Sequence, residues 1–152
     1  MHTVELLLDD ELADAVRRQW DFLLEAGLPS LAGHPHPTNR PHLTVVRASS
    51  LAGLPALPVP LAAELGPARK LGRALVRQVT PTPELRELHF RVWSALPDAW
   101  PPPGEWVPHV SLALRFPLPD VPALPAGGDR GQFVAARSYD TVTRTVHPIV
   151  PG

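Results

Sequence analysis

Two short segments of the chain repeat the same order of residue types: proline, histidine, an apolar residue, a hydroxyl residue and a second apolar residue. They read PHLTVVR at positions 41–47 and PHVSLALR at positions 108–115. Imidazole can take or give a proton near neutral pH, because its unperturbed pKa is about 6.5. Two imidazoles are therefore enough for both proton transfers of a displacement at phosphorus, provided that the fold brings the two segments together.

Side-chain alternation decides which groups of the two segments can act together. Along a β-strand, residues i and i+2 point to the same face, so His42 stands with Thr44. By the same spacing His109 stands with Ser111, and the apolar residues between them anchor the opposite face. A hydroxyl can donate to a nonbridging phosphate oxygen while one imidazole acts as base and the other as acid. We predict that the histidines transfer protons and the hydroxyls bind phosphate, with no metal or cofactor and with the acid and base roles left open.

Two helices are predicted between the strands. The first is capped by Asp9 or Asp10 and stops at Gly27, and the second starts at Thr82 with Pro83 in its first turn. Both have apolar residues at helical spacing on one face. These residues are Leu12, Val16, Trp20, Leu23 and Leu24 in the first helix and Leu85, Leu88, Val92 and Leu96 in the second.

The remaining apolar runs predict strands. They are residues 2–8, 42–48, 58–66, 70–79 and 109–116, followed by a closing hairpin of 131–139 and 141–147. Most of the 21 prolines lie between these runs, where they punctuate the chain.

The order of elements repeats. A strand, a helix, a proline-rich loop and a histidine strand come first, and the same series returns after further strands. We therefore predict one domain over residues 1–152 with an α+β fold made of two lobes. We expect two mostly antiparallel sheets related by a pseudo-twofold axis, a central cleft between them, and helices on the outside.

Composition narrows the class of function. The chain has 14 Lys and Arg against 15 Asp and Glu, so its formal net charge is -1, which disfavours binding to extended duplex nucleic acid. It has no cysteine, which rules out thiol chemistry and disulfides. The segment MHTVELLL followed by acidic residues does not read as a signal peptide or membrane span, so we expect a cytoplasmic protein with no membrane partner.

The paired phrases His42-Leu-Thr44-Val and His109-Val-Ser111-Leu resemble the two H-x-[TS]-x motifs of the two-histidine (2H) phosphoesterase superfamily. This superfamily includes the 2′-5′ RNA ligase and cyclic nucleotide phosphodiesterase branches. The resemblance implies a bilobal duplicated fold, metal-independent acid–base catalysis, and a small cyclic nucleotide or an RNA terminus as the partner. In the ligase branch an arginine commonly stands five places after the second histidine, and Leu114 occupies that place here.

Two alternatives from other classes stay open. One is a noncatalytic module that binds phosphate or RNA ends with the same four residues. The other is a metal-dependent hydrolase built on His34, His36 and His42, although no carboxylate lies near them in the sequence. Two tryptophans before the second motif, Trp100 and Trp106, could stack on a base at the cleft mouth or, as we favour, cover an apolar edge.

Overall fold

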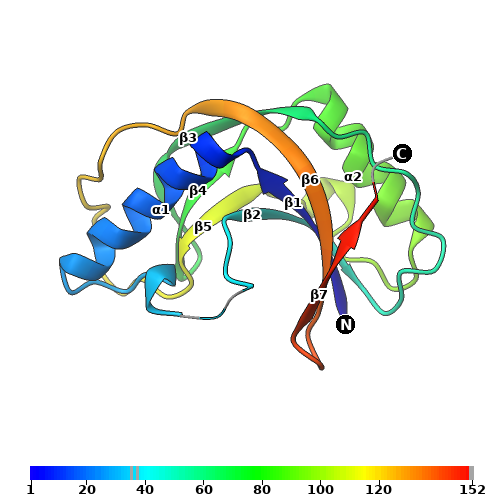
Figure 1. The fold of residues 1–152 in the computed structure, drawn as a ribbon, viewed down its shortest axis with the longest axis horizontal. Helices are drawn as coiled ribbons and strands as arrows, with labels where there is room; N and C mark the ends of the chain where they lie inside the picture. Colours follow the sequence, from blue (N-terminus) through cyan, green and yellow to red (C-terminus); the bar gives the residue numbers. More distant parts are fainter. Residues whose placement is uncertain (35, 37, 151–152) are drawn as a thin grey trace.

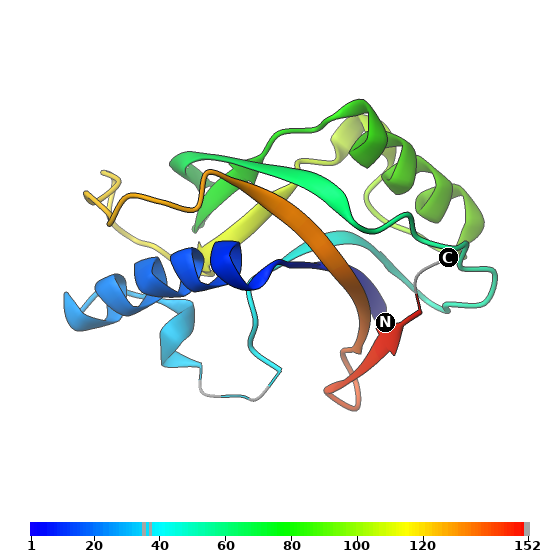
Figure 2. The ribbon, with the colours of Figure 1, turned by 45° about the horizontal axis from the view of Figure 1, so that its top comes forward.

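The computed structural model describes residues 1–34, 36 and 38–150. Figures 1 and 2 show a strongly curved sheet with a helix toward each end. The elements are β1 (His2–Leu8), α1 (Asp10–Glu25), η1 (Leu31–Gly33), β2 (His42–Ala48), β3 (Leu61–Leu71), β4 (Ala74–Val79), α2 (Pro83–Ala95), η2 (Pro103–Glu105), β5 (His109–Ala113), β6 (Arg130–Asp140) and β7 (Thr145–Ile149). The predicted α+β class is confirmed.

All strand pairings are antiparallel, and the sheet closes on itself. Its order is β1-β2-β5-β4-β3-β6-β7, and β6 also pairs with β1. Six strands therefore form a ring, while β7 lies outside it on β6. Exchanging β1, β2 and β3 for β4, β5 and β6 leaves the order around the ring unchanged. This is the pseudo-twofold relation that the repeated order of elements predicts.

The two expected sheets are joined at both of their edges. One set consists of β6, β1 and β2, and the other of β3, β4 and β5. Strand β2 meets β5 through the single pair Leu43 and Val110, whereas β3 meets β6 through residues 61–64 and 130–133. Strands β3 and β6 are each 11 residues long, so one end pairs within its own set and the other end crosses to the second set.

Both helices begin at the predicted caps. The Asp9 carboxylate accepts a hydrogen bond from the Leu12 backbone N–H at 2.8 Å, and the Thr82 hydroxyl accepts one from the Leu85 N–H at 3.2 Å. Each helix buries its predicted apolar face except at Leu24, which is 49% exposed near the end of α1. No helix among the described residues combines the length and apolar character of a membrane span.

The turn of the closing hairpin is wider than predicted. Strand β7 begins at Thr145 and not at residue 141. The Asp140 carboxylate accepts hydrogen bonds from the backbone N–H groups of Val142 at 2.9 Å and Thr143 at 3.3 Å. These two bonds lower the pKa of the Asp140 carboxyl. They also hold residues 141–144 in a turn that ends at Arg144, whose φ is 57°.

Candidate active site

The two repeated segments meet in one cleft of about 810 Å³. His42 and Thr44 reach this cleft from β2, and His109 and Ser111 reach it from β5. In Figure 1 the segment between α1 and β2 lies on one side of the opening and the β6–β7 hairpin lies on the other. The fold thus brings all four predicted residues onto one concave surface, although 67 positions separate the two histidines in the sequence.

The two imidazoles are held in the same way. Nδ1 of His42 lies 2.7 Å from the Arg40 carbonyl oxygen, and Nδ1 of His109 lies 2.8 Å from the Val107 carbonyl oxygen. A carbonyl oxygen can only accept a hydrogen bond, so Nδ1 carries the hydrogen in both rings. Nε2 is therefore the atom at which each ring can take up or release a proton.

The strand register explains why each histidine faces a hydroxyl. Leu43 of β2 pairs with Val110 of β5 in antiparallel register, and both side chains are fully buried. Continuing that register by one residue in each direction sets His42 opposite Ser111 and Thr44 opposite His109. The four polar residues consequently form two crosswise pairs around the buried apolar pair.

Two indoles fix the backbone of the hydroxyl residues. The Trp20 indole N–H of α1 donates to the Ser111 carbonyl oxygen at 3.0 Å. The Trp106 indole N–H, which precedes β5, donates to the Thr44 carbonyl oxygen at 3.2 Å. Each motif strand is therefore anchored at the same position by a tryptophan from the opposite half of the chain.

A buried ion pair, which the sequence analysis did not identify, lies beside the first histidine. Glu5 of β1 is 4% exposed, and its Oε1 accepts a hydrogen bond from Nε of Arg137 at 2.8 Å. Its Oε2 accepts one from the Thr3 hydroxyl at 2.8 Å and lies 3.6 Å from Nε2 of His42. A lone carboxylate in the apolar run HTVELLL was the available sequence signal, because a buried acid needs a partner.

The second histidine has different surroundings. Glu5 pairs with Thr44 across β1 and β2, and at the related position of the other half Val76 pairs with Ser111 across β4 and β5. Among the described residues no carboxylate lies within ion-pair distance of His109. The two proton-transfer candidates therefore share their local geometry but differ in charge environment.

The cleft has two polar walls. The β6–β7 wall, which we define as Arg137, Tyr139, Thr141 and Arg144, faces a loop wall between α1 and β2. The loop wall contributes His34, His36, Thr38 and Asn39. Among the residues that the structure describes, no three His, Cys, Asp or Glu side chains form a group that could hold a metal ion. The hypothesis of a metal site on His34, His36 and His42 thus gains no support from their arrangement.

The loop wall is held by its own hydrogen bonds. Nδ2 of Asn39 donates to the carbonyl oxygens of Leu31 at 2.7 Å and His34 at 2.8 Å. Nδ1 of His36 lies 2.6 Å from the Thr38 hydroxyl oxygen. These bonds connect the described residues of the loop wall to one another and to η1.

The other arginines near the motifs do not line this cleft. Strand β5 ends at Ala113, and Leu114 lies at the cleft rim, 57% exposed. Arg115 lines neighbouring surface pockets and Arg47 is exposed on β2, so neither supplies a cation to the histidines. The cations of the cleft are instead Arg137 of β6 and Arg144 of the β6–β7 turn.

Trp106 packs against protein and not into the cleft. Its ring stacks on His89 of α2, with centroids 4.2 Å apart and planes 13° apart. Burial lowers the pKa of His89, and a hydrogen bond to the Pro101 backbone offsets this in part. Trp106 also packs against the hydrophobic core, as expected for a residue that covers an apolar edge. Trp100 is absent from the cleft lining as well, but it is 47% exposed, so the structure does not show it covering an apolar edge.

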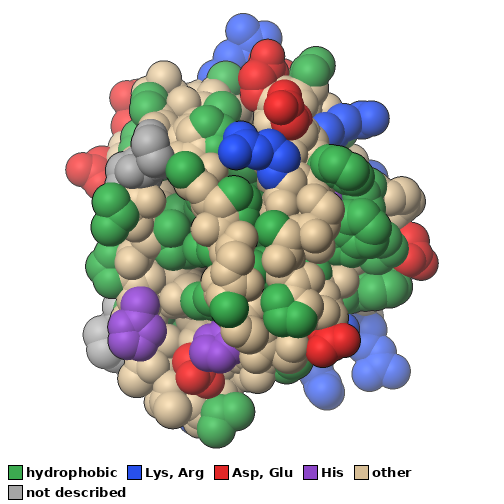
Figure 3. Space-filling view, turned by 90° about the vertical axis from the view of Figure 1, so that its right-hand side faces the viewer, with side chains coloured by type: hydrophobic (Ala, Val, Ile, Leu, Met, Phe, Trp, Pro, Cys, Tyr) green, Lys and Arg blue, Asp and Glu red, His purple; other side chains and the backbone are tan. Residues whose placement is uncertain are grey.

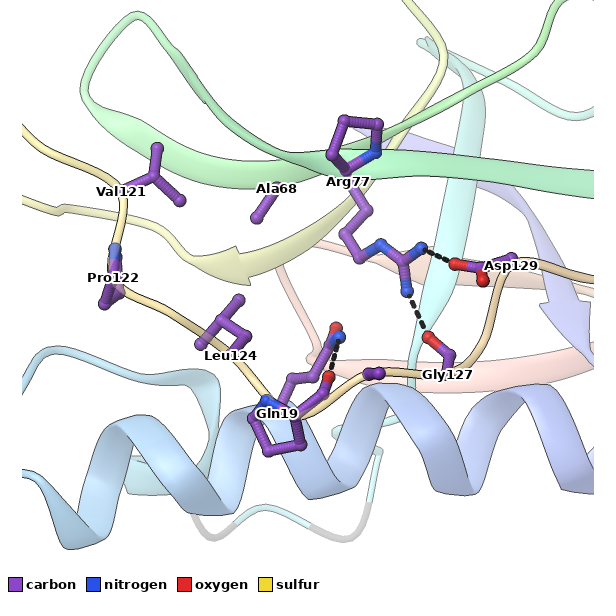
Figure 4. Close-up of a pocket in the computed structure, with 11 residues that line it drawn as sticks. Gln19, Ala68, Arg77, Val121, Pro122, Leu124, Gly127 and Asp129 are labelled. Atoms are coloured by element: carbon purple, nitrogen blue, oxygen red, sulfur yellow. Dashed lines mark hydrogen bonds and ion pairs between the residues drawn. The ribbon is translucent and has the colours of Figure 1, made fainter.

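A second pocket, shown in Figure 4, lies between α1, β3, β4 and the segment 121–129. Its central cation is Arg77, which is 3% exposed. The Arg77 guanidinium donates to the carbonyl oxygens of Gly66 at 2.8 Å, Gly127 at 2.9 Å and Leu65 at 3.3 Å, and to Asp129 at 2.9 Å. All three guanidinium nitrogens are thus committed to protein, and we interpret Arg77 as a structural clamp on the segment.

Comparison with solved structures identifies the fold. The chain is similar to E. coli LigT, a 2′-5′ RNA ligase of the 2H phosphoesterase superfamily. The LigT complex with NADP+ superposes with a TM-score of 0.63 at 16% sequence identity, covering 98% of this chain and 94% of LigT. The phosphate complex gives 0.60 at 16%, covering 98% and 93%, and the 3′-AMP complex gives 0.61 at 15%, covering 98% and 94%.

The likeness in fold that the two motifs predict is therefore confirmed. It is a likeness of structure, since no family model matches the chain and no curated protein matches its sequence.

Proposed function

We propose that the chain is a metal-independent phosphoesterase that acts on 2′,3′-cyclic phosphates or on 2′-5′-linked nucleotide or RNA ends. His42 and His109 are the proposed acid–base pair, and Thr44 and Ser111 are the proposed phosphate-binding residues. The observation that carries the proposal is the matched pair of imidazoles, each with Nδ1 held by a carbonyl oxygen and each lining the same cleft.

The proposed reaction follows from this arrangement. For a 2′,3′-cyclic phosphate, Nε2 of one neutral imidazole takes a proton from water as the water oxygen attacks phosphorus. The bond from phosphorus to one ribose oxygen breaks, and the other imidazole, entering as imidazolium, gives its Nε2 proton to that oxygen. The hydroxyls donate to the nonbridging oxygens, where negative charge is held throughout. A nucleoside monophosphate results, and proton exchange with solvent resets the pair.

The size and charge of the protein fit a small substrate. LigT has been crystallised with 3′-AMP, with phosphate and with NADP+, which supports a nucleotide or RNA terminus as the partner here. Figure 3 shows the face over α2, where cationic and anionic side chains are interspersed and neither sign forms a stripe. The formal net charge of -1 supports a short phosphate-bearing ligand over an extended duplex. Such substrates are consistent with the cytoplasmic location expected from the sequence.

The test is turnover of a panel of 2′,3′-cyclic nucleotides and 2′-5′-linked oligonucleotides, with and without EDTA, with product regiochemistry determined. We expect turnover that EDTA leaves intact. Turnover abolished by EDTA would support a metal-dependent hydrolase, and binding without turnover would support the noncatalytic module. Either outcome would overturn the proposal.

A further inference from the structure

Arg137 has hydrogen-bonding capacity that the protein itself does not use. Its side chain is 9% exposed, and its Nε donates to Glu5. Among the described residues, neither terminal nitrogen of Arg137 has a hydrogen-bond partner, and the residue lines the histidine cleft. A nearly buried guanidinium therefore directs its remaining donors toward the space that a substrate would fill.

Arg77 shows what a structural arginine looks like in the same protein. Its side chain is also buried, at 3% exposed against 9% for Arg137. All three of its guanidinium nitrogens donate, to three carbonyl oxygens and a carboxylate. Arg137 uses one nitrogen and leaves two. The Glu5 carboxylate offsets its charge and fixes its plane, as expected for a residue positioned to bind a ligand.

The sheet places Arg137 two strands away from Thr44, one of the proposed phosphate-binding residues. Arg137 pairs with Glu5 across β6 and β1, and Glu5 pairs with Thr44 across β1 and β2. Neighbouring strands are about 4.8 Å apart, so the backbones of β6 and β2 are separated by about 10 Å. The Glu5 carboxylate stands between the two groups, with Oε1 2.8 Å from Nε of Arg137 and Oε2 3.6 Å from Nε2 of His42. The proposed reacting phosphate, held between β2 and β5, lies on the His42 side of this carboxylate, and a second phosphate on the same nucleotide can reach the Arg137 side.

The charges of the cleft also favour an additional anion. Glu5 is the one acidic residue among those that line the cleft, and it is already bonded to Arg137. Arg144 adds a second cation at the hairpin, and Tyr139 lies between the two arginines on the β6–β7 wall. This end of the cleft therefore carries a net positive charge in a protein whose total formal charge is -1.

We propose that Arg137 binds a second phosphate of the substrate, so that the preferred substrates carry a phosphate in addition to the reacting one. The inference rests on the proposed function and narrows its substrate class to nucleotides phosphorylated at two positions, such as an RNA end. Two parallel N–H donors suit phosphate oxygens, and such charge-assisted bonds are stronger than neutral ones.

The test compares adenosine 2′,3′-cyclic phosphate with the same nucleotide carrying a 5′-phosphate. The readout is the ratio of the two kcat/KM values on one preparation, which cancels any difference in the folded fraction. We expect the wild-type protein to favour the 5′-phosphorylated substrate by about 10- to 100-fold. The Glu5→Gln variant should keep this ratio, whereas adding Arg137→Met to Glu5→Gln should bring it near one.

Working in the Glu5→Gln background avoids leaving a buried carboxylate without its partner. Arg69→Met is the matched control, because Arg69 pairs with Val76 on β4 as Arg137 pairs with Glu5 on β1. Arg69 lies outside the cleft lining, so its loss should leave the ratio unchanged. A ratio near one in the wild type, or an equal loss on both substrates when Arg137 is replaced, would overturn the inference and leave the proposed function standing.

Failure of the proposed function would be seen separately, as absence of turnover of both substrates. In that event calorimetric binding of adenosine 3′,5′-bisphosphate is compared with binding of adenosine 3′-monophosphate. A preference for the bisphosphate that disappears with Arg137→Met would support the second-phosphate site without catalysis. Equal affinities in the wild-type protein would overturn it.

Discussion

The two halves of the ring hold their histidines identically and surround them differently. Both imidazoles use Nδ1 to bind a carbonyl oxygen two residues back, and both motif strands are anchored by an indole. Beside His42 lies the Glu5–Arg137 pair, whereas Val76 occupies the place of Glu5 in the other half. Under the proposed function, both halves supply an oriented imidazole and a hydroxyl, whereas only the first half has a charged wall that could orient a substrate.

The largest expected effect comes from replacing the histidines, which the two halves hold in the same way. His42→Ala and His109→Ala should each lower kcat/KM on a 2′,3′-cyclic phosphate by roughly 10²- to 10⁴-fold, because each removes one proton transfer. The double variant should be little worse than either single one, since the two groups act as a unit. Steady-state kinetics measure this, with His147→Ala on the exposed face of β7 as the control. Near-wild-type turnover in either single variant would show that the pair is misassigned.

The next largest effect concerns the Glu5–Arg137 ion pair, which lies beside His42 and has no counterpart beside His109. Glu5→Leu should lower the free energy of unfolding by about 3 to 5 kcal/mol, because it leaves the buried Arg137 without its counterion. Glu64→Leu is the control: Glu64 and Arg130 form an exposed pair at 3.7 Å, which should contribute less than about 1 kcal/mol. Urea unfolding measures both.

The companion double variant distinguishes loss of a counterion from loss of packing. Adding Arg137→Met to Glu5→Leu should restore much of the stability, because two apolar side chains then replace the ion pair. A double variant as unstable as the sum of its single changes would contradict this interpretation of the pair.

A smaller effect tests the two indole anchors. Trp20→Phe and Trp106→Phe should each cost about 1 to 3 kcal/mol, since each leaves a motif carbonyl without its donor. Thermal or urea unfolding of the two variants measures the losses. Similar losses would confirm that the two indoles contribute equally to stability. If one of the two substitutions left the free energy of unfolding unchanged, that indole would not stabilise the fold and the two anchors would not be equivalent.

The smallest effect concerns His89, which stacks on one of these anchors. Because burial lowers its pKa, the unfolded chain binds a proton there that the folded chain excludes as pH falls below the ordinary value of 6.5. The free energy of unfolding should therefore fall as pH decreases through this range, and His89→Phe should weaken that dependence while keeping an aromatic ring against Trp106. Tm measured between about pH 7 and pH 5 tests this, and an unchanged slope would exclude His89 as its source.

The parts that could be predicted from the sequence are those that local rules govern. The caps Asp9 and Thr82 and the buried helical faces follow from short-range spacing. The alternation in each motif correctly puts imidazole and hydroxyl on one face. The strand pairing of β3 with β6 and of β2 with β5 depends on contacts between distant residues, so the closed ring could not be deduced in the same way.

The residues that the sequence did not reveal depend on partners elsewhere in the chain. Arg137 lies 132 positions from Glu5, and the segment FVAARSY gives no indication of which arginine is buried. Arg47 and Arg115 were nearer to the motifs in sequence, yet neither lines the cleft. Proximity along the chain was therefore a poor guide to the cation, because the ring brings β6 next to β1.

The crossing of β3 and β6 between the two sets of strands has a consequence for how activity depends on folding. Strand β3 follows β2 in the chain but completes the sheet of β4 and β5, and β6 in turn completes the sheet of β1 and β2. Neither half of the chain therefore contains all three strands of the set to which its own histidine strand belongs. Partial unfolding of one half would remove a strand from the other, so the spacing of the two imidazoles depends on cooperative folding of the whole ring.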